Sequence, residues 1–119
     1  MKQLFSHPNC STCKKAIKWL DEHEVEYELF DIREVQPTKE QFKALLTKNG
    51  YTVRNLFNTS GGQYRKLGLK DQLEQLTEEE IFDFLTTQGM LVKRPVLMDG
   101  EVGTAGFKEE IYEKVWGKK

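Results

Sequence analysis

The sequence is poor in cysteine and proline, and it has no long run of apolar residues. Its 119 residues include two cysteines and three prolines. Two cysteines cannot form the disulfide framework that stabilises small secreted domains. Apolar runs of only a few residues exclude a transmembrane helix. No apolar leader segment follows Met1, because residues 1–3 lead directly into a strand pattern. We therefore expect a protein of the reducing cytoplasm that does not enter a membrane.

An excess of charge of one sign is also absent. The net charge is −1, and lysines and glutamates are interspersed along the chain, which disfavours direct nucleic-acid binding. Charged residues make up 31% and hydrophobic residues 38%, proportions typical of a globular domain. The length suffices for one domain but hardly for two. We expect residues 1–119 to form a single, monomeric domain without a cofactor.

Both cysteines lie in one short motif near the N-terminus. Cys10 and Cys13 follow an apolar pair, Leu4 and Phe5, and precede a helical pattern. A CxxC motif between a strand and a helix is typical of thioredoxin-like redox proteins. The first turn of a helix has free N–H groups and favours negative charge. We therefore expect a lowered pKa for Cys10, while Cys13, one turn further on, attacks a mixed disulfide formed on Cys10.

Three other uses of the cysteine pair are less well supported. Zinc needs four ligands, and only His7 and His23 could complete a set, so we expect no metal site. A structural disulfide would close a very short loop and would remove little entropy from the unfolded chain. The third alternative, two inert thiols in the core, remains open.

The rest of the chain predicts an α/β fold. A strand at residues 2–5, a helix at 11–23 and a strand at 25–32 form a βαβ unit with a parallel strand pair. Residues 38–89 are helical, with capping-box patterns at Thr38 and Thr77, a stop at Gly50 and an end at Gly89.

The C-terminal part completes the predicted sheet. Two short strands, 96–98 and 101–104, flank a turn, and a helix at 107–116 presents Phe107, Ile111 and Val115 on its apolar face. Together these elements predict a four-stranded mixed sheet, βαβ…ββα, with a helical insert.

Arg94 and Pro95 form the second informative motif. A proline that begins a strand is cis and faces the CxxC motif in a thioredoxin-like fold; an ordinary trans proline is the alternative. Arg94 would then stabilise a thiolate or an oxyanion, unless it is a solvated surface residue. His7 could donate to Cys10 or be solvated. The loop at residues 58–62 is either a nest of N–H groups for an anion or a simple connection between helices.

Four segments resemble the arsenate reductase/Spx (ArsC-like) family, which includes MgsR. They are PNCSTCKKA at 8–16, YRKL at 64–67, KRPV at 93–96 and GF at 106–107. The resemblance implies a thioredoxin-like sheet with a helical insert. In glutaredoxin-coupled arsenate reductases the cysteine matching Cys10 attacks arsenate, and three arginines hold it. Only Arg94 is matched here; Asn58 and residues 106–107 stand where the other two are expected, which disfavours arsenate reduction.

Spx-type regulators have the CxxC motif and bind the C-terminal domain of the RNA polymerase α subunit. The resemblance places Gly50 near their polymerase-contact glycine. The sequence thus leaves two hypotheses. The first is a thiol–disulfide oxidoreductase that a thioredoxin or glutaredoxin reduces. The second is a redox-sensing regulator.

In the first hypothesis Cys10 is the nucleophile, Cys13 resolves and Arg94 stabilises charge. The predicted substrate-binding residues are Asn9, Ser11, Thr12, Asn58 and Pro95.

Overall fold

The computed structural model describes residues 1–117. The elements are β1 (Lys2–Ser6), α1 (Ser11–Glu22), β2 (Tyr27–Asp31), α2 (Lys39–Lys48), η1 (Arg54–Leu56), α3 (Gly62–Lys66), η2 (Leu69–Asp71), α4 (Glu78–Thr87), η3 (Gly89–Leu91), β3 (Val96–Asp99), β4 (Val102–Ala105) and α5 (Glu109–Trp116). Within these residues no helix has the length and apolar character needed to span a bilayer.

The four strands form one mixed sheet in the order β2-β1-β3-β4. β1 pairs in parallel with β2 and antiparallel with β3, and β3 pairs antiparallel with β4. Phe5 of β1 lies opposite Phe30 on one side and Val96 on the other. The predicted βαβ…ββα sheet is therefore confirmed, and it is a thioredoxin-like fold. The register brings the end of β1 and the start of β3 to the same edge of the sheet.

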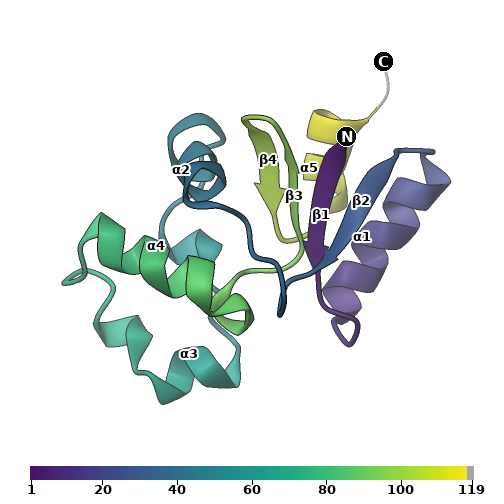
Figure 1. Ribbon diagram of the computed structural model, residues 1–119. Helices are drawn as coiled ribbons and strands as arrows, with labels where there is room; N and C mark the ends of the chain where they lie inside the picture. The colour runs from purple at the N-terminus through teal and green to yellow at the C-terminus, as the bar shows by residue number, and fades with distance from the viewer. Residues whose placement is uncertain (118–119) are drawn as a thin grey trace.

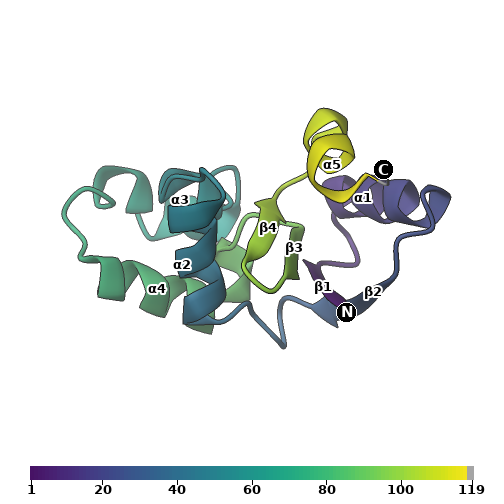
Figure 2. The ribbon, with the colours of Figure 1, turned by 90° about the horizontal axis from the view of Figure 1, so that it is seen from above.

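Alternation along the strands gives the sheet two buried faces. Leu4 and Leu97 pack with α1 and α5, which lie together on one face (Figure 2). Phe5, Val96 and Met98 face the other way and pack with the helical insert. The insert, α2 to η3, gathers beside β4, away from α1 (Figure 1). Because successive residues of a strand point to opposite faces, one short apolar run supplies both cores.

Two predicted capping boxes begin the longest helices of the insert. Thr38 accepts the N–H of Gln41, whose side chain in turn binds the N–H of Thr38. Thr77 and Glu80 repeat the arrangement at the start of α4. Each pair satisfies N–H groups that the first turn of a helix leaves free, so these starts could be predicted from the sequence.

The predicted apolar face of the last helix is wrong by about one position. Tyr112 and Trp116 are buried, whereas Ile111 is only partly buried and Val115 is 36% exposed. The buried pair packs against α1 and β3, and the indole Nε1 of Trp116 donates to the buried Thr104 hydroxyl at 3.1 Å. Large aromatic side chains bury more area than Ile111 or Val115 would, and so they decide the orientation of the helix.

The end of α4 also differs from the prediction. The helix ends at Thr87, and Gly89 does not cap it with a left-handed conformation but begins η3. Gly89 has a different role: a Cβ there would lie 1.9 Å from the carbonyl oxygen of Ile32. The glycine lets the insert approach the backbone that follows β2.

Candidate active site

Cys10 is the N-cap residue of α1. Its backbone is extended, and its N–H donates to the carbonyl oxygen of His7 at 3.2 Å. The backbone N–H of Cys13 donates to the Cys10 sulfur at 3.3 Å. A side-chain atom that accepts from the first turn of a helix lies at its positive end, where negative charge is stabilised. The sequence predicted this location at the junction of strand and helix.

The pKa values of the two thiols are shifted in opposite directions. Burial raises the pKa of Cys10, but hydrogen bonds from the side chain and backbone of Cys13, together with the Arg94 guanidinium, outweigh it and leave the pKa below its ordinary value. Burial, followed by the hydrogen bond to Cys10, raises the pKa of Cys13 to about 12. Both cysteines are free, and Cys13 is only 1% exposed. This arrangement favours ionisation of the partly exposed Cys10 over ionisation of the buried Cys13.

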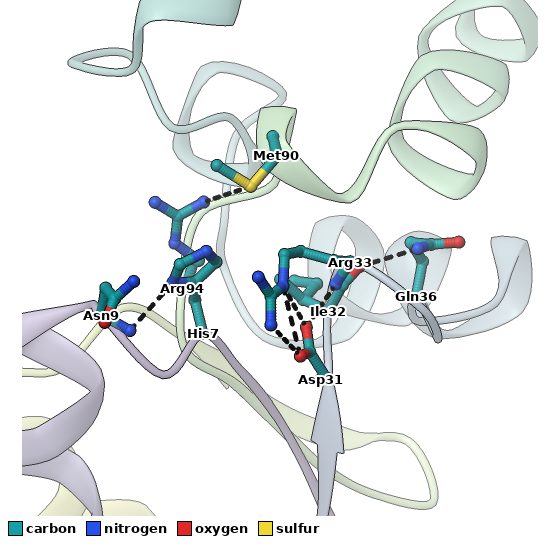
Figure 3. A network of polar contacts seen from close by, with 8 residues as sticks. All are labelled: His7, Asn9, Asp31, Ile32, Arg33, Gln36, Met90 and Arg94. Atoms are coloured by element: carbon teal, nitrogen blue, oxygen red, sulfur yellow. Dashed lines mark hydrogen bonds and ion pairs between the residues drawn. The ribbon is translucent and has the colours of Figure 1, made fainter.

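The peptide bond between Arg94 and Pro95 is cis, which is one of the two alternatives that the sequence left open. Pro95 is buried at the start of β3, and its carbonyl oxygen accepts the N–H of Gly106 at 2.8 Å. The Arg94 Nη1 lies 3.8 Å from the sulfur of Met90 (Figure 3). Arg94 comes just before β3 and Cys10 just after β1, so the antiparallel register of these strands puts both residues at the same edge of the sheet, as expected.

A cleft of about 280 Å³ opens beside Cys10, and we refer to it as the Cys10 cleft. Four segments meet there: the start of α1, the loop after η1, the start of β3 and the connection from β4 to α5. Its lining residues are Cys10, Thr12, Asn58, Ser60, Lys93, Arg94, Ala105, Gly106, Phe107 and Lys108. Thus four of the predicted site residues, Cys10, Thr12, Asn58 and Arg94, share one cleft although they are up to 84 positions apart in the chain.

The other predicted substrate residues do not line the Cys10 cleft. Ser11 is exposed as the first residue of α1, and Pro95 is buried behind Arg94. The backbone N–H of Asn9 donates to Nδ1 of His7 at 3.0 Å (Figure 3). Burial, then the charges of Arg94 and Arg33, lowers the pKa of His7. Nδ1 of His7 therefore accepts a hydrogen bond from the backbone of Asn9 and does not donate one to Cys10.

Gly50 lies far from this site. The preceding residue, Asn49, binds the tip of the β3–β4 hairpin through the carbonyl oxygen of Glu101 and the N–H of Gly103. The strand register puts that tip at the start of β1, whereas Cys10 follows its end. Gly50 has φ +79°, as predicted for a helix stop, and it is exposed. A surface around Gly50 would therefore be separate from the cysteines.

Sequence reasoning assigned no role to two cations of the Cys10 cleft, Lys93 and Lys108. Lys93 is adjacent to Arg94, and this adjacency was a signal that could have been used. The stem of Lys93 crosses Gly106, where a Cβ would lie 3.0 Å from its Cε. No sequence signal identifies Lys108, because only the packing of α5 brings its start to the cleft.

A second hollow, of about 430 Å³, adjoins Cys13. We refer to it as the Cys13 hollow. Asp31 and Glu34 contribute carboxylates to it, and Ile17, Leu29 and Phe30 contribute apolar surface. The surroundings of the two cysteines therefore differ in charge. Among residues 1–117 no group of three or more His, Cys, Asp or Glu side chains could hold a metal ion.

Comparison with other proteins finds one relative of high sequence identity and a more distant one that is a regulatory protein. The chain is 47% identical to YusI of Bacillus subtilis over 113 residues, which are 95% of this chain and 96% of YusI. It is 26% identical to the regulatory protein MgsR of Bacillus subtilis over 116 residues, 98% of this chain and 90% of MgsR.

A solved structure also resembles this chain along nearly its whole length. A protein related to the ArsC family from Bacteroides fragilis superimposes with a TM-score of 0.87 and is 42% identical, covering 96% of this chain and 97% of that one. The ArsC family model matches residues 5–115, nearly the whole length. The chain therefore belongs to the ArsC family.

Proposed function

We propose that the protein is a dithiol oxidoreductase that reduces disulfide bonds. Cys10 is the nucleophile, Cys13 is the resolving cysteine and Arg94 stabilises the negative charge on Cys10. The observation that carries the proposal is the place of Cys10 at the N-cap of α1, where its sulfur accepts the N–H of the buried Cys13 at 3.3 Å. The two pKa values shift in opposite directions, in agreement with this geometry. A lowered pKa increases the fraction of Cys10 that is the nucleophilic thiolate, and a raised pKa keeps the proton on Cys13 until Cys13 attacks.

The reaction has two exchange steps. The Cys10 thiolate attacks one sulfur of the substrate disulfide, forms a mixed disulfide and releases the other sulfur as a thiolate. Cys13 then gives its proton to solvent and attacks the Cys10 sulfur. This second step releases the remaining substrate thiol and leaves a disulfide between Cys10 and Cys13. Two electrons pass from the protein to the substrate, and a thioredoxin- or glutaredoxin-type dithiol in the cytoplasm returns them.

Arsenate reduction is a less supported form of this chemistry. The resemblance implies three arginines around the oxyanion, and Arg94 is matched while Asn58 is uncharged. An uncharged amide cannot replace the two-point, charge-assisted hydrogen bonds that a guanidinium makes to an oxyanion.

The test of the oxidoreductase is a thiolate titration combined with trapping. We expect the ultraviolet absorbance of the thiolate to titrate below the ordinary cysteine range and to disappear in Cys10→Ser. Cys13→Ser should accumulate one stable mixed disulfide per chain with hydroxyethyl disulfide, as measured by mass spectrometry. A Cys10 thiol as basic as one in a free peptide would contradict the proposal.

Arg94 can be tested separately with a matched control. Arg94→Gln removes the charge beside Cys10, so the pKa of Cys10 should rise and its alkylation at neutral pH should slow. Arg54→Gln removes the charge of an exposed arginine in η1 that does not line the cleft. The control should leave the titration of Cys10 unchanged.

The second candidate is a redox-sensing regulator that binds the C-terminal domain of the RNA polymerase α subunit near Gly50. The similarity to the regulatory protein MgsR favours it. Binding should be measured with reduced and oxidised protein. Absence of binding in both states would remove this candidate and leave the oxidoreductase in place.

A further inference from the structure

The charges around the Cys10 cleft indicate a substrate class. Lys93, Arg94 and Lys108 all line it, and among the described residues that line it none is acidic. The carboxylates of Asp31 and Glu34 line the Cys13 hollow, together with Lys14, and do not line the Cys10 cleft. A substrate that approaches Cys10 therefore meets positive charge.

The two lysines come from different parts of the fold. Lys93 is held at the end of the insert, where its N–H donates to the carbonyl oxygen of Leu56 at 2.8 Å. Lys108 is the N-cap residue of α5. Both side chains are exposed, and no ion pair with a described carboxylate is found for either. Their charges are available to a ligand in the cleft.

We propose that Lys93 and Lys108 select disulfides that carry a carboxylate close to the reacting sulfur. This inference rests on the proposed function and names its substrate class. When Cys10 attacks such a disulfide, the lysines hold the carboxylate while Arg94 stays with the attacking sulfur. Lysine ammonium groups suit this role because they are flexible point charges. The cleft, at about 280 Å³, has room for an organic acid group beside the sulfur pair.

The chemistry is the exchange already described, with the carboxylate as a spectator. The bond between Cys10 and the substrate sulfur forms, the substrate disulfide breaks, and the leaving thiolate takes the electron pair of the broken bond. The lysines neither gain nor lose protons. They raise the concentration of anionic substrate at the cleft, and a cleft lined with one sign of charge can raise association rates about ten-fold or more.

The test uses the full chain carrying Cys13→Ser, so that the reaction stops at the mixed disulfide. Second-order rate constants are measured with three disulfides of similar size: dithiodipropionate, which is a dianion, hydroxyethyl disulfide, which is neutral, and cystamine, which is a dication. We expect dithiodipropionate to react about ten-fold faster than the neutral compound, and cystamine to react more slowly than it. Added salt should reduce the differences.

Variants then locate the preference. Lys93→Met together with Lys108→Met keeps the apolar stems and removes both charges, so the ratio of anionic to neutral rates should fall by about ten-fold. Lys93→Arg should retain the preference. Lys43→Met together with Lys70→Met removes the same charge from exposed positions outside the cleft and should leave the ratio unchanged.

The outcomes separate the two proposals. If none of the three disulfides modifies Cys10, the oxidoreductase itself is wrong. If all three react at the same rate, or if the preference survives loss of Lys93 and Lys108, the oxidoreductase stands and this substrate class is refuted. If the remote lysine pair matters equally, overall charge rather than the cleft causes the preference, and the inference is again refuted.

Discussion

Replacement of Gly89 by alanine tests how the insert is joined to the sheet. The new Cβ would lie 1.9 Å from the carbonyl oxygen of Ile32 and 2.8 Å from its carbon, closer than the 3.0 Å that real Cβ atoms keep. Both atoms belong to the backbone that follows β2, so no side-chain rotation relieves the contact. The same carbonyl oxygen accepts a 2.7 Å hydrogen bond from Gln36. The insert and the sheet must separate by about 1 Å, in an interior packed as densely as a crystal.

Three effects set the magnitude. Overpacking a buried position costs about 1–3 kcal/mol. Weakening the hydrogen bond between Gln36 and Ile32 adds about 1 kcal/mol. The lower entropy of an alanine-containing unfolded chain offsets up to about 1 kcal/mol of this loss of stability. We therefore expect Gly89→Ala to lower the free energy of unfolding by about 1–4 kcal/mol, a large part of the stability of a small domain.

Urea denaturation followed by circular dichroism measures this change. Gly62→Ala is the control: Gly62 begins α3 and a Cβ there meets nothing within 4 Å, so its stability should stay within about 0.5 kcal/mol or rise slightly. Because Arg94 lies only three residues after the end of η3, the pKa of Cys10 should also rise in Gly89→Ala. A loss below about 0.5 kcal/mol would refute the close approach.

Three further outcomes are expected. Asn49→Ala removes hydrogen bonds to two carbonyl oxygens and one N–H, at 2.9, 2.8 and 3.2 Å, and should cost about 2 kcal/mol in urea denaturation. Trp116→Phe leaves the buried Thr104 hydroxyl without its indole donor and should cost about 1–3 kcal/mol by the same measurement, whereas an unchanged midpoint would contradict the contact. Alkylation of Cys10 should accelerate as pH rises through its lowered pKa and then level off. No second rise from Cys13 should follow below about pH 10, because the pKa of Cys13 is raised to about 12; a second labelled site at pH 9 would contradict this.

Local chemistry is what the sequence determines well in this protein. The capping boxes at Thr38 and Thr77 need only residues three positions apart, and the N-cap place of Cys10 needs only a strand pattern before a helix pattern. The mixed sheet follows from the order of the elements, because a strand–helix–strand unit of that length is parallel and a two-residue turn is antiparallel. That residues 1–119 form one domain, and the roles of the site residues, remain predictions.

The tertiary structure decided what depends on residues far apart in the chain. Periodicity alone assigned Ile111 and Val115 to the buried face of α5, but packing against α1 buried Tyr112 and Trp116 instead. A glycine after a helix suggested a helix stop at Gly89, although its reason is contact with a backbone 57 positions earlier.

The positive Cys10 cleft is the clearest example of this division. No spacing rule connects Lys108 with Cys10, because only the folding of β3, β4 and α5 against the start of α1 brings them to the same opening. Hydrogen bonds within a turn are encoded by neighbours, whereas the charge of a cleft is a sum over segments that meet only after the sheet has formed.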